Sequence, residues 1–159
     1  SSDSFMVSMW IYPIEEHSWS CAMYVKYETG FFGMIPLAWE GHSSFRIRDS
    51  KEVDGWYDIS GCKLQVNEWS HYVVSYNAKT ETAYAYINGQ LVGKMKNVPG
   101  NRYAKRIVLG GDVFQPSFIG KICEVTFYNE IRDHDFVYNL HQSYVTRDDF
   151  IGFEIGIDK

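Results

Sequence analysis

The sequence has few of the residues that build a metal centre, a disulfide framework or a membrane segment. Its 3 cysteines, Cys21, Cys62 and Cys123, include no Cys-x-x-Cys pair, so there is no zinc signature. The odd number leaves at least one thiol unpaired. Both a Cys21–Cys62 disulfide and a set of reduced, buried thiols agree with the sequence. No apolar run approaches the ~20 residues of a membrane helix, and no Asn-x-Ser/Thr sequon occurs.

Basic residues are also scarce. The chain has 15 Lys and Arg against 20 Asp and Glu, which gives a net charge of −5. Nucleic acids and anionic membranes attract a basic face, so the composition favours neither nucleic-acid binding nor membrane insertion. No signal peptide is recognisable, and the first residue is Ser1 rather than Met, as in a mature, trimmed or partial chain. The 159 residues fit a single domain, 1–159.

Aromatic residues are abundant, and they recur in short alternating segments. Phe, Tyr and Trp make up 17% of the chain, and such rings suit half-buried strands. Alternation of apolar and polar residues predicts strands at Phe5–Tyr12, Cys21–Tyr27, Phe31–Trp39, Ser44–Arg48, Trp56–Ile59, Trp69–Tyr76, Thr82–Ile87, Gln90–Met95, Arg106–Leu109, Phe118–Tyr128 and Phe150–Ile157. Short strands separated by turn residues indicate an all-β sandwich or barrel.

Two local signals are sharper than the general pattern. Asn88-Gly89 stands between two alternating runs and predicts a tight hairpin, because a type I′ turn needs φ > 0 at both central residues. The segment from Asp133 to Tyr144 has helical periodicity instead, and an Asp at its start can cap a helix. We therefore predict one short helix near residues 134–144.

Three ordered segments then resemble one family of sandwiches. They are Phe5–Pro13 (FMVSMWIYP); Asn67–Tyr76 (NEWSHYVVSY) leading to Ala85–Gly89 (AYING); and Leu109–Gly111 with Phe118–Ile122 and Val125–Asn129. Their sequence, order and spacing resemble the laminin-G and pentraxin-like branch of the concanavalin A-like lectin/glucanase superfamily, over roughly residues 5–145. The resemblance implies a jelly-roll sandwich of two antiparallel sheets.

The same resemblance implies a range of functions, and the sequence departs from the family's pattern at two places. The fold hosts lectins, carbohydrate-binding modules, adhesion domains and glycosidases, mostly outside the cell or on its surface, so it does not select a function by itself. The family usually has a strand before the opening motif. Either Phe150–Ile157 fills that edge here, or the first strand has been removed. Cys123 stands where many relatives have Asp.

Two further functions of this fold, catalysis and calcium binding, depend on carboxylate residues. Glycosidases of this fold carry several carboxylates on one strand, but the pattern begun by Glu52 and Asp54 lacks its third member, so we predict no enzyme. Relatives hold Ca²⁺ with oxygen ligands at the sandwich rim. Asp112 stands near such a position, but its neighbours Val113 and Phe114 offer no side-chain oxygen. Asp112 is therefore the one candidate metal ligand.

Carbohydrate binding is the remaining specific hypothesis. A sugar site stacks an exposed ring against a pyranose and adds a few polar groups for orientation. The resemblance places Trp10 and Trp69 in the core, and Trp19 is a weaker candidate. The predicted carbohydrate-binding residues are Trp39, Trp56, Tyr57, Asp54, Arg46 and Arg48. The sequence thus predicts a non-catalytic, lectin-like module for a glycan or glycoprotein. The alternative is a protein-interaction or structural domain without a sugar ligand.

Overall fold

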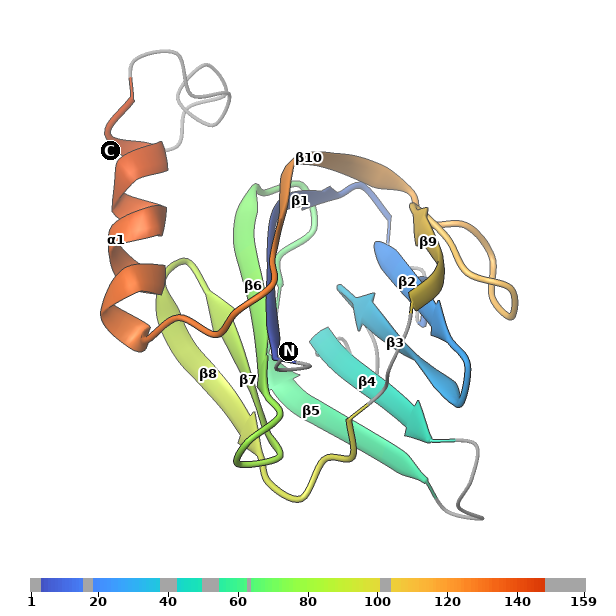
Figure 1. Cartoon of the computed structure of the whole chain (residues 1–159). Coiled ribbons are helices and arrows are strands. Elements are labelled where there is room, and N and C mark those ends of the chain that lie inside the picture. Colours follow the sequence, from blue (N-terminus) through green and yellow to red (C-terminus); the bar gives the residue numbers. More distant parts are fainter. Residues whose placement is uncertain are drawn as a thin grey trace.

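The computed structural model shows two β-sheets and one helix (Figure 1), and describes residues 4–15, 19–37, 43–49, 55–62, 64–100 and 104–147. The strands are β1 (Phe5–Pro13), β2 (Met23–Tyr27), β3 (Gly30–Ile35), β4 (Ser43–Asp49), β5 (Trp56–Cys62), β6 (Ser70–Asn77), β7 (Thr82–Ile87), β8 (Gln90–Met95), β9 (Ala104–Leu109) and β10 (Gly120–Tyr128). Helix α1 spans His134–Val145. The predicted strand at Phe150–Ile157 lies outside the described residues.

The strands form a sandwich in which every pairing is antiparallel. The first sheet has the order β10-β1-β6-β7-β8, and the second has the order β5-β4-β3-β2-β9. This confirms the predicted jelly-roll sandwich of two antiparallel sheets. At one side of the sandwich β5 contacts β7 and β8, so the two sheets meet there. The edge strands of the other side are β9 and β10.

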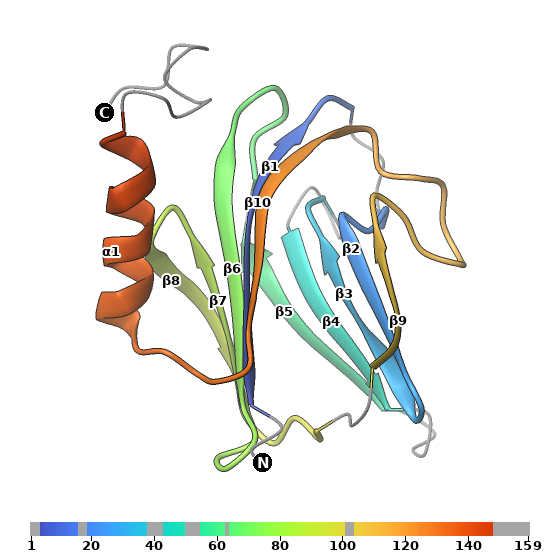
Figure 2. The same ribbon diagram turned by 45° about the horizontal axis from the view of Figure 1, so that its top comes forward.

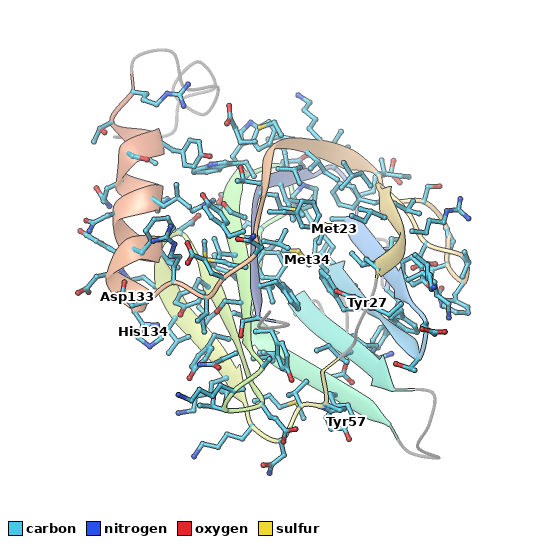
Figure 3. All side chains as sticks on the ribbon, viewed as in Figure 1. Met23, Tyr27, Met34, Tyr57, Asp133 and His134 are labelled. Carbon is cyan, nitrogen blue, oxygen red and sulfur yellow. The ribbon has the colours of Figure 1, made fainter. Side chains whose placement is uncertain are left out.

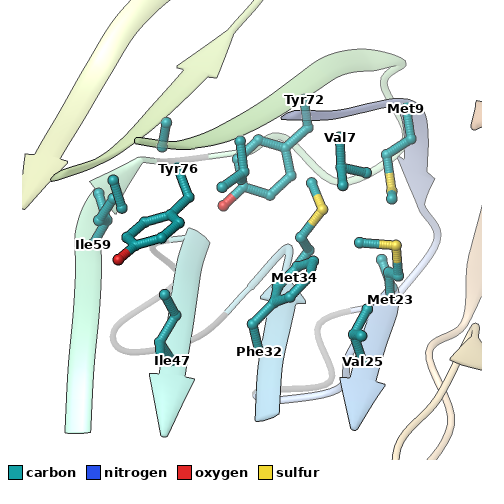
Figure 4. Packing of buried hydrophobic residues seen from close by; sticks show 14 of the residues in the cluster. Val7, Met9, Met23, Val25, Phe32, Met34, Ile47, Ile59, Tyr72 and Tyr76 are labelled. Atoms are coloured by element: carbon teal, nitrogen blue, oxygen red, sulfur yellow. The ribbon is translucent and has the colours of Figure 1, made fainter. Parts of the chain in front are cut away.

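The core lies between the sheets and is built by the alternation that the sequence shows. Val7 and Met9 of β1 point toward Met23, Met34 and Phe32 of the second sheet (Figure 4). Each of these five side chains is at most 2% exposed. Burying one such side chain is worth about 1.5–3 kcal/mol, so the period-two pattern fixes which face of each strand is inside.

Helix α1 covers the outer face of the first sheet (Figure 2). Asp133 caps it, accepting a hydrogen bond of 2.8 Å from the Phe136 backbone N–H, as the sequence predicts. Asp133 and His134 mark the start of the helix in Figure 3. Trp10 and Trp69 are buried as predicted, but they pack with Tyr144 under the helix rather than between the sheets. Within the described residues, no helix has the length and apolarity that crossing a membrane requires.

Turn chemistry explains two element boundaries. Asn88 and Gly89 have φ values of 51° and 80°, which confirms the predicted hairpin between β7 and β8. Strand β3 ends at Ile35, short of the predicted end at Trp39, because Pro36 has no N–H to continue the ladder. Cys21 is a free thiol, so the Cys21–Cys62 disulfide is not formed.

Candidate functional site

The outer face of the second sheet carries a row of paired residues with a gap at its centre. Strand register aligns Val108, Tyr24, Gly33, Arg46 and Asp58 across all five strands. The residues before and after them along each strand point into the core, because alternate residues face opposite sides. Gly33 has no side chain, and a Cβ there would lie 3.0 Å from the Cys21 Sγ. The row therefore has a hollow between Tyr24 and Arg46.

A pocket of about 310 Å³ occupies this hollow. Its walls are largely aromatic. Tyr24 and Phe31 lie 5.2 Å apart between ring centroids, and Phe31 lies 5.6 Å from Phe114. Tyr24 is 2% exposed whereas Phe114 is 65% exposed, so Phe114 is a ring at the mouth of the pocket. Such an exposed ring beside a buried aromatic wall can stack a planar or sugar face.

Arg46 provides the cationic wall of the pocket and is held in place from two sides. Its Nε and Nη2 donate to the two carboxylate oxygens of Asp58 at 2.5 and 2.8 Å. Its guanidinium carbon lies 4.5 Å from the centroid of the Trp19 ring. A bidentate pair and a stacked ring fix the orientation of an Arg side chain that would otherwise sample many rotamers.

Trp19 adopts a backbone conformation that few non-glycine residues adopt. Its φ is 71°, in the left-handed region, and its N–H donates to the Leu37 carbonyl at 3.0 Å. Such a conformation costs roughly 1–2 kcal/mol in an L-residue. Strain of this kind gathers at functional sites, and here it places the Trp19 ring against Arg46.

Asp112 closes the pocket and orders the loop that carries Phe114. Its Oδ1 accepts hydrogen bonds from the backbone N–H groups of Phe114 and Gln115 at 2.6 and 2.7 Å. Burial, and next the hydrogen bond to Asp112, raise the pKa of the Cys21 thiol well above its usual range. The pKa of Tyr24 is raised by burial and then by the Asp112 charge. Both groups are neutral near pH 7, and a neutral buried thiol is not a nucleophile.

That Asp112 binds a metal ion stays a prediction. In the structure its Oδ1 accepts hydrogen bonds from two backbone amides. No three His, Cys, Asp or Glu side chains of the described residues gather in a way that could hold a metal ion. Asp112 therefore acts in this structure as the cap of a turn.

The remaining predicted site residues fall in three places. Register places the Arg48 and Trp56 positions on the pocket face, in the row next to Arg46; their side chains lie outside the described part. Tyr57 pairs with Ile47 on the opposite face and packs against the core. Trp39 and Asp54 lie outside the described residues, as does the incomplete carboxylate pattern that begins at Glu52.

The structure adds three rings that the sequence did not single out: Tyr24, Phe31 and Phe114. Alternation with Met23, Val25 and Phe32 predicts that Tyr24 and Phe31 are strand residues, but it does not show which face of the sheet holds a pocket. In the sequence Phe114 is only a neighbour of Asp112 that lacks a side-chain oxygen. An aromatic residue two positions after a turn-forming Asp was the available signal.

These features define a two-sheet sandwich with a lectin-like fold, an aromatic pocket on one face and a helix on the other. The family model described as the concanavalin A-like lectin/glucanases superfamily matches residues 1–137, and the chain belongs to this superfamily. No curated protein matches the chain in sequence.

Solved structures with the same fold include several glycan complexes. Domain 4 of AbnA, a GH43 extracellular arabinanase from Geobacillus stearothermophilus, was solved with arabinotriose; it is 23% identical with a TM-score of 0.74, covering 89% of this chain and 68% of that chain. A SAP-like pentraxin from Limulus polyphemus is 16% identical with a TM-score of 0.68, and the match covers 95% of this chain and 73% of the pentraxin chain. The CBM40 of a Ruminococcus gnavus IT-sialidase, bound to alpha2,6 sialyllactose, is 12% identical with a TM-score of 0.69, and the match covers 89% of this chain and 84% of the CBM40 chain.

Proposed function

We propose that the protein is a non-catalytic carbohydrate-binding module and that the pocket on the second sheet is its glycan site. One observation carries the proposal: the exposed ring of Phe114 stands at the mouth of an aromatic pocket whose rim also holds Arg46 and Asp112. A ring that stacks on the C–H face of a sugar, with a few polar groups beside it, is the composition of a carbohydrate site.

The residues of the pocket have different roles in binding the sugar. The Phe114 ring stacks on the sugar, and the guanidinium of Arg46 donates to hydroxyl or ring oxygens. Asp58 and Trp19 hold Arg46 in position before the ligand arrives, so little rotamer entropy is lost on binding. The Arg48 and Trp56 positions, one row further along the same face, extend the site for a longer oligosaccharide.

The carboxylate that lines the pocket, Asp112, and the one that pairs with Arg46, Asp58, support binding rather than hydrolysis. A glycosidase needs one carboxyl group to donate a proton and a second to attack or to activate water. Asp58 is held by the bidentate pair with Arg46, and Asp112 is held by the amides of its own turn. Neither is placed as a general acid. Neighbours that bind arabinotriose or sialyllactose with this fold support a glycan or glycoprotein partner and a secreted or cell-surface location.

The test is retention of the full chain on immobilised glycans, with arabino-oligosaccharide and sialyllactose as the first probes. Phe114→Ala should weaken binding by about tenfold, the value of a lost stacking contact of roughly 1.4 kcal/mol. Val113→Ala is the matched control, because Val113 is 60% exposed in the same loop and does not line the pocket. Equal retention of the two variants would contradict the site.

A protein-interaction domain without a sugar ligand remains the second candidate, and one observation favours it. Three large apolar side chains on the edge strands β9 and β10 are about half exposed: Ile107, Leu109 and Phe127. Exposed apolar residues that cluster along a sheet edge mark a surface that another segment covers. If no glycan on an array binds and Phe114→Ala changes nothing, this second function becomes the better account.

A further inference from the structure

Two basic residues, Lys26 of β2 and Arg106 of β9, are paired directly across neighbouring strands. Val25, which precedes Lys26, is a core residue, and alternate residues of a strand face opposite sides. Lys26 and Arg106 therefore lie on the outer face of the second sheet, which is the face that carries the pocket, and both are exposed. Figure 2 shows β2 and β9 side by side at the margin of this sheet.

This pairing of like charges is unfavourable for the sheet by itself. Cross-strand pairs of the same charge destabilise a sheet, whereas opposite charges stabilise it. The chain has 20 acidic residues against 15 basic ones, so carboxylates are not scarce. Even so, neither Lys26 nor Arg106 forms an ion pair within the part of the chain that the structure describes. Two adjacent cations without a carboxylate form a surface that an anionic group would complete.

The basic pair lies next to the wall of the pocket. Lys26 pairs with Arg106 on one side and with Phe31 on the other, and Phe31 lines the pocket. Tyr24, another wall residue, precedes Lys26 by two positions on the same face, about 7 Å along the strand. Burial and then the Asp112 charge raise the pKa of Tyr24, and the Arg106 charge opposes them. The field of Arg106 therefore reaches the pocket wall.

The charges inside the pocket decide where an anionic group can lie. Arg46 is already neutralised by its bidentate pair with Asp58, and Asp112 adds a negative charge to the lining. A second anion inside the pocket would meet Asp112 without a free counter-charge, and like charges in one site repel. An anionic group is favoured instead outside the pocket, over Lys26 and Arg106.

We propose that Lys26 and Arg106 bind the anionic group, a carboxylate or a sulfate, of an acidic sugar residue whose neighbour in the same glycan occupies the pocket. The inference rests on the proposed glycan site and narrows its ligands to acidic oligosaccharides. The uncharged face of one sugar stacks in the pocket, while the next sugar places its anion between the ammonium and the guanidinium.

Matched pairs of oligosaccharides test the preference for charge with the full chain. Oligogalacturonate and its methyl ester differ only in the carboxylate charge, and a sulfated galactan oligosaccharide and its desulfated form differ only in the sulfate. At least one acidic ligand should bind about fivefold or more tightly than its uncharged form, which is the value of two exposed ion pairs. The pair that shows the difference identifies the anion as carboxylate or sulfate.

A double variant assigns the preference to the basic pair. Lys26→Gln with Arg106→Gln should reduce the ratio of acidic to uncharged binding to about one, and should melt no lower than the unmodified chain because a repulsion is removed. Lys79→Gln with Lys94→Gln is the matched control, because it removes the same charge from exposed residues of the first sheet. A ratio that falls equally in the control would overturn the proposal in favour of a general charge effect.

The remaining outcomes separate this inference from the glycan site on which it rests. If both forms of each ligand bind equally and Phe114→Ala weakens both, the pocket is a glycan site and the basic pair is not part of it. If an acidic preference depends on Lys26 and Arg106 but Phe114→Ala changes nothing, the anion site holds and the pocket assignment fails. If none of the four oligosaccharides is retained, both proposals are overturned.

Discussion

Ser8 and His71 share a hydrogen bond of 2.7 Å, between Oγ and Nε2, in the fully buried layer between the first sheet and helix α1. The His71 ring also stacks on Trp10 and His141 at 5.1 and 5.5 Å between centroids. His71 is therefore a structural hydrogen-bonding residue of this layer, and its protonation should affect the pH range in which the protein is stable.

Stability should fall in mild acid because of His71. Burial, with a smaller contribution from His141, lowers the pKa of His71 to about 3 from its ordinary 6.5. Between these values the unfolded chain binds a proton that the folded chain does not, so the free energy of unfolding decreases as the pH falls from about 6.5 toward 3. The loss is on the order of 5 kcal/mol, at about 1.4 kcal/mol per pKa unit.

Urea unfolding between pH 4 and pH 7 measures how the free energy of unfolding depends on pH. An NMR titration of the His71 ring shows whether His71 causes this dependence. His71→Gln should have a smaller slope in the same window, with lower stability at pH 7. A His71 resonance that titrates near its ordinary value would contradict the buried, neutral state.

The Asn88-Gly89 hairpin should tolerate no side chain at its second position. Gly89 has a φ of 80°, and a Cβ there would lie 3.1 Å from the Cβ of His141 in helix α1. Gly110 has a φ of 77° but would meet no atom within 4 Å, so Gly110→Ala measures the backbone strain alone. We expect Gly110→Ala to cost about 1–2 kcal/mol of unfolding free energy and Gly89→Ala at least about 1 kcal/mol more. Equal losses of unfolding free energy in the two variants would show that a side chain at position 89 does not clash with helix α1.

Gly33 should be energetically coupled to Cys21, which lines the pocket. Gly33→Ala brings a methyl group to 3.0 Å from the Cys21 Sγ, which is tighter than ordinary contact. The expected loss is about 1–2 kcal/mol of unfolding free energy, with weaker glycan retention. Cys21→Ala removes the sulfur, so the double variant should recover at least about 0.5 kcal/mol relative to the sum of the single changes. Additive effects in denaturant unfolding would show that the side chains at positions 33 and 21 do not clash.

Asp112 should act through its turn rather than through a metal. Asp112→Ala removes the acceptor for two backbone amides and should cost about 1 kcal/mol of stability and weaken glycan binding by disordering Phe114. Asp112→Asn keeps an oxygen acceptor and should retain most of both. Millimolar Ca²⁺ should leave the melting temperature of the chelator-treated protein within about 1 °C. A calcium-dependent rise that Asp112→Asn abolishes would restore the metal hypothesis.

Local patterns in the sequence were sufficient to predict the buried strand faces, the hairpin and the helix cap. Val7 and Met9 are inside because alternation along a strand leaves one face to bury, and the φ values of Asn88 and Gly89 follow from the hairpin that their types favour. Asp133 caps α1 because its side chain reaches the backbone N–H three residues later. Each of these interactions joins residues that are close in the chain.

The site depended on the tertiary structure. Trp19, Arg46 and Phe114 are far apart in the sequence, and only the register of β2, β3 and β4 and the fold of the loop after β9 bring them to one pocket. Register between strands also put Tyr57 against the core while it placed the Trp56 position on the pocket face. Alternation along a strand shows only that neighbouring residues face opposite sides of the sheet. For a half-polar strand, the sheet that packs against it decides which of the two sides is buried.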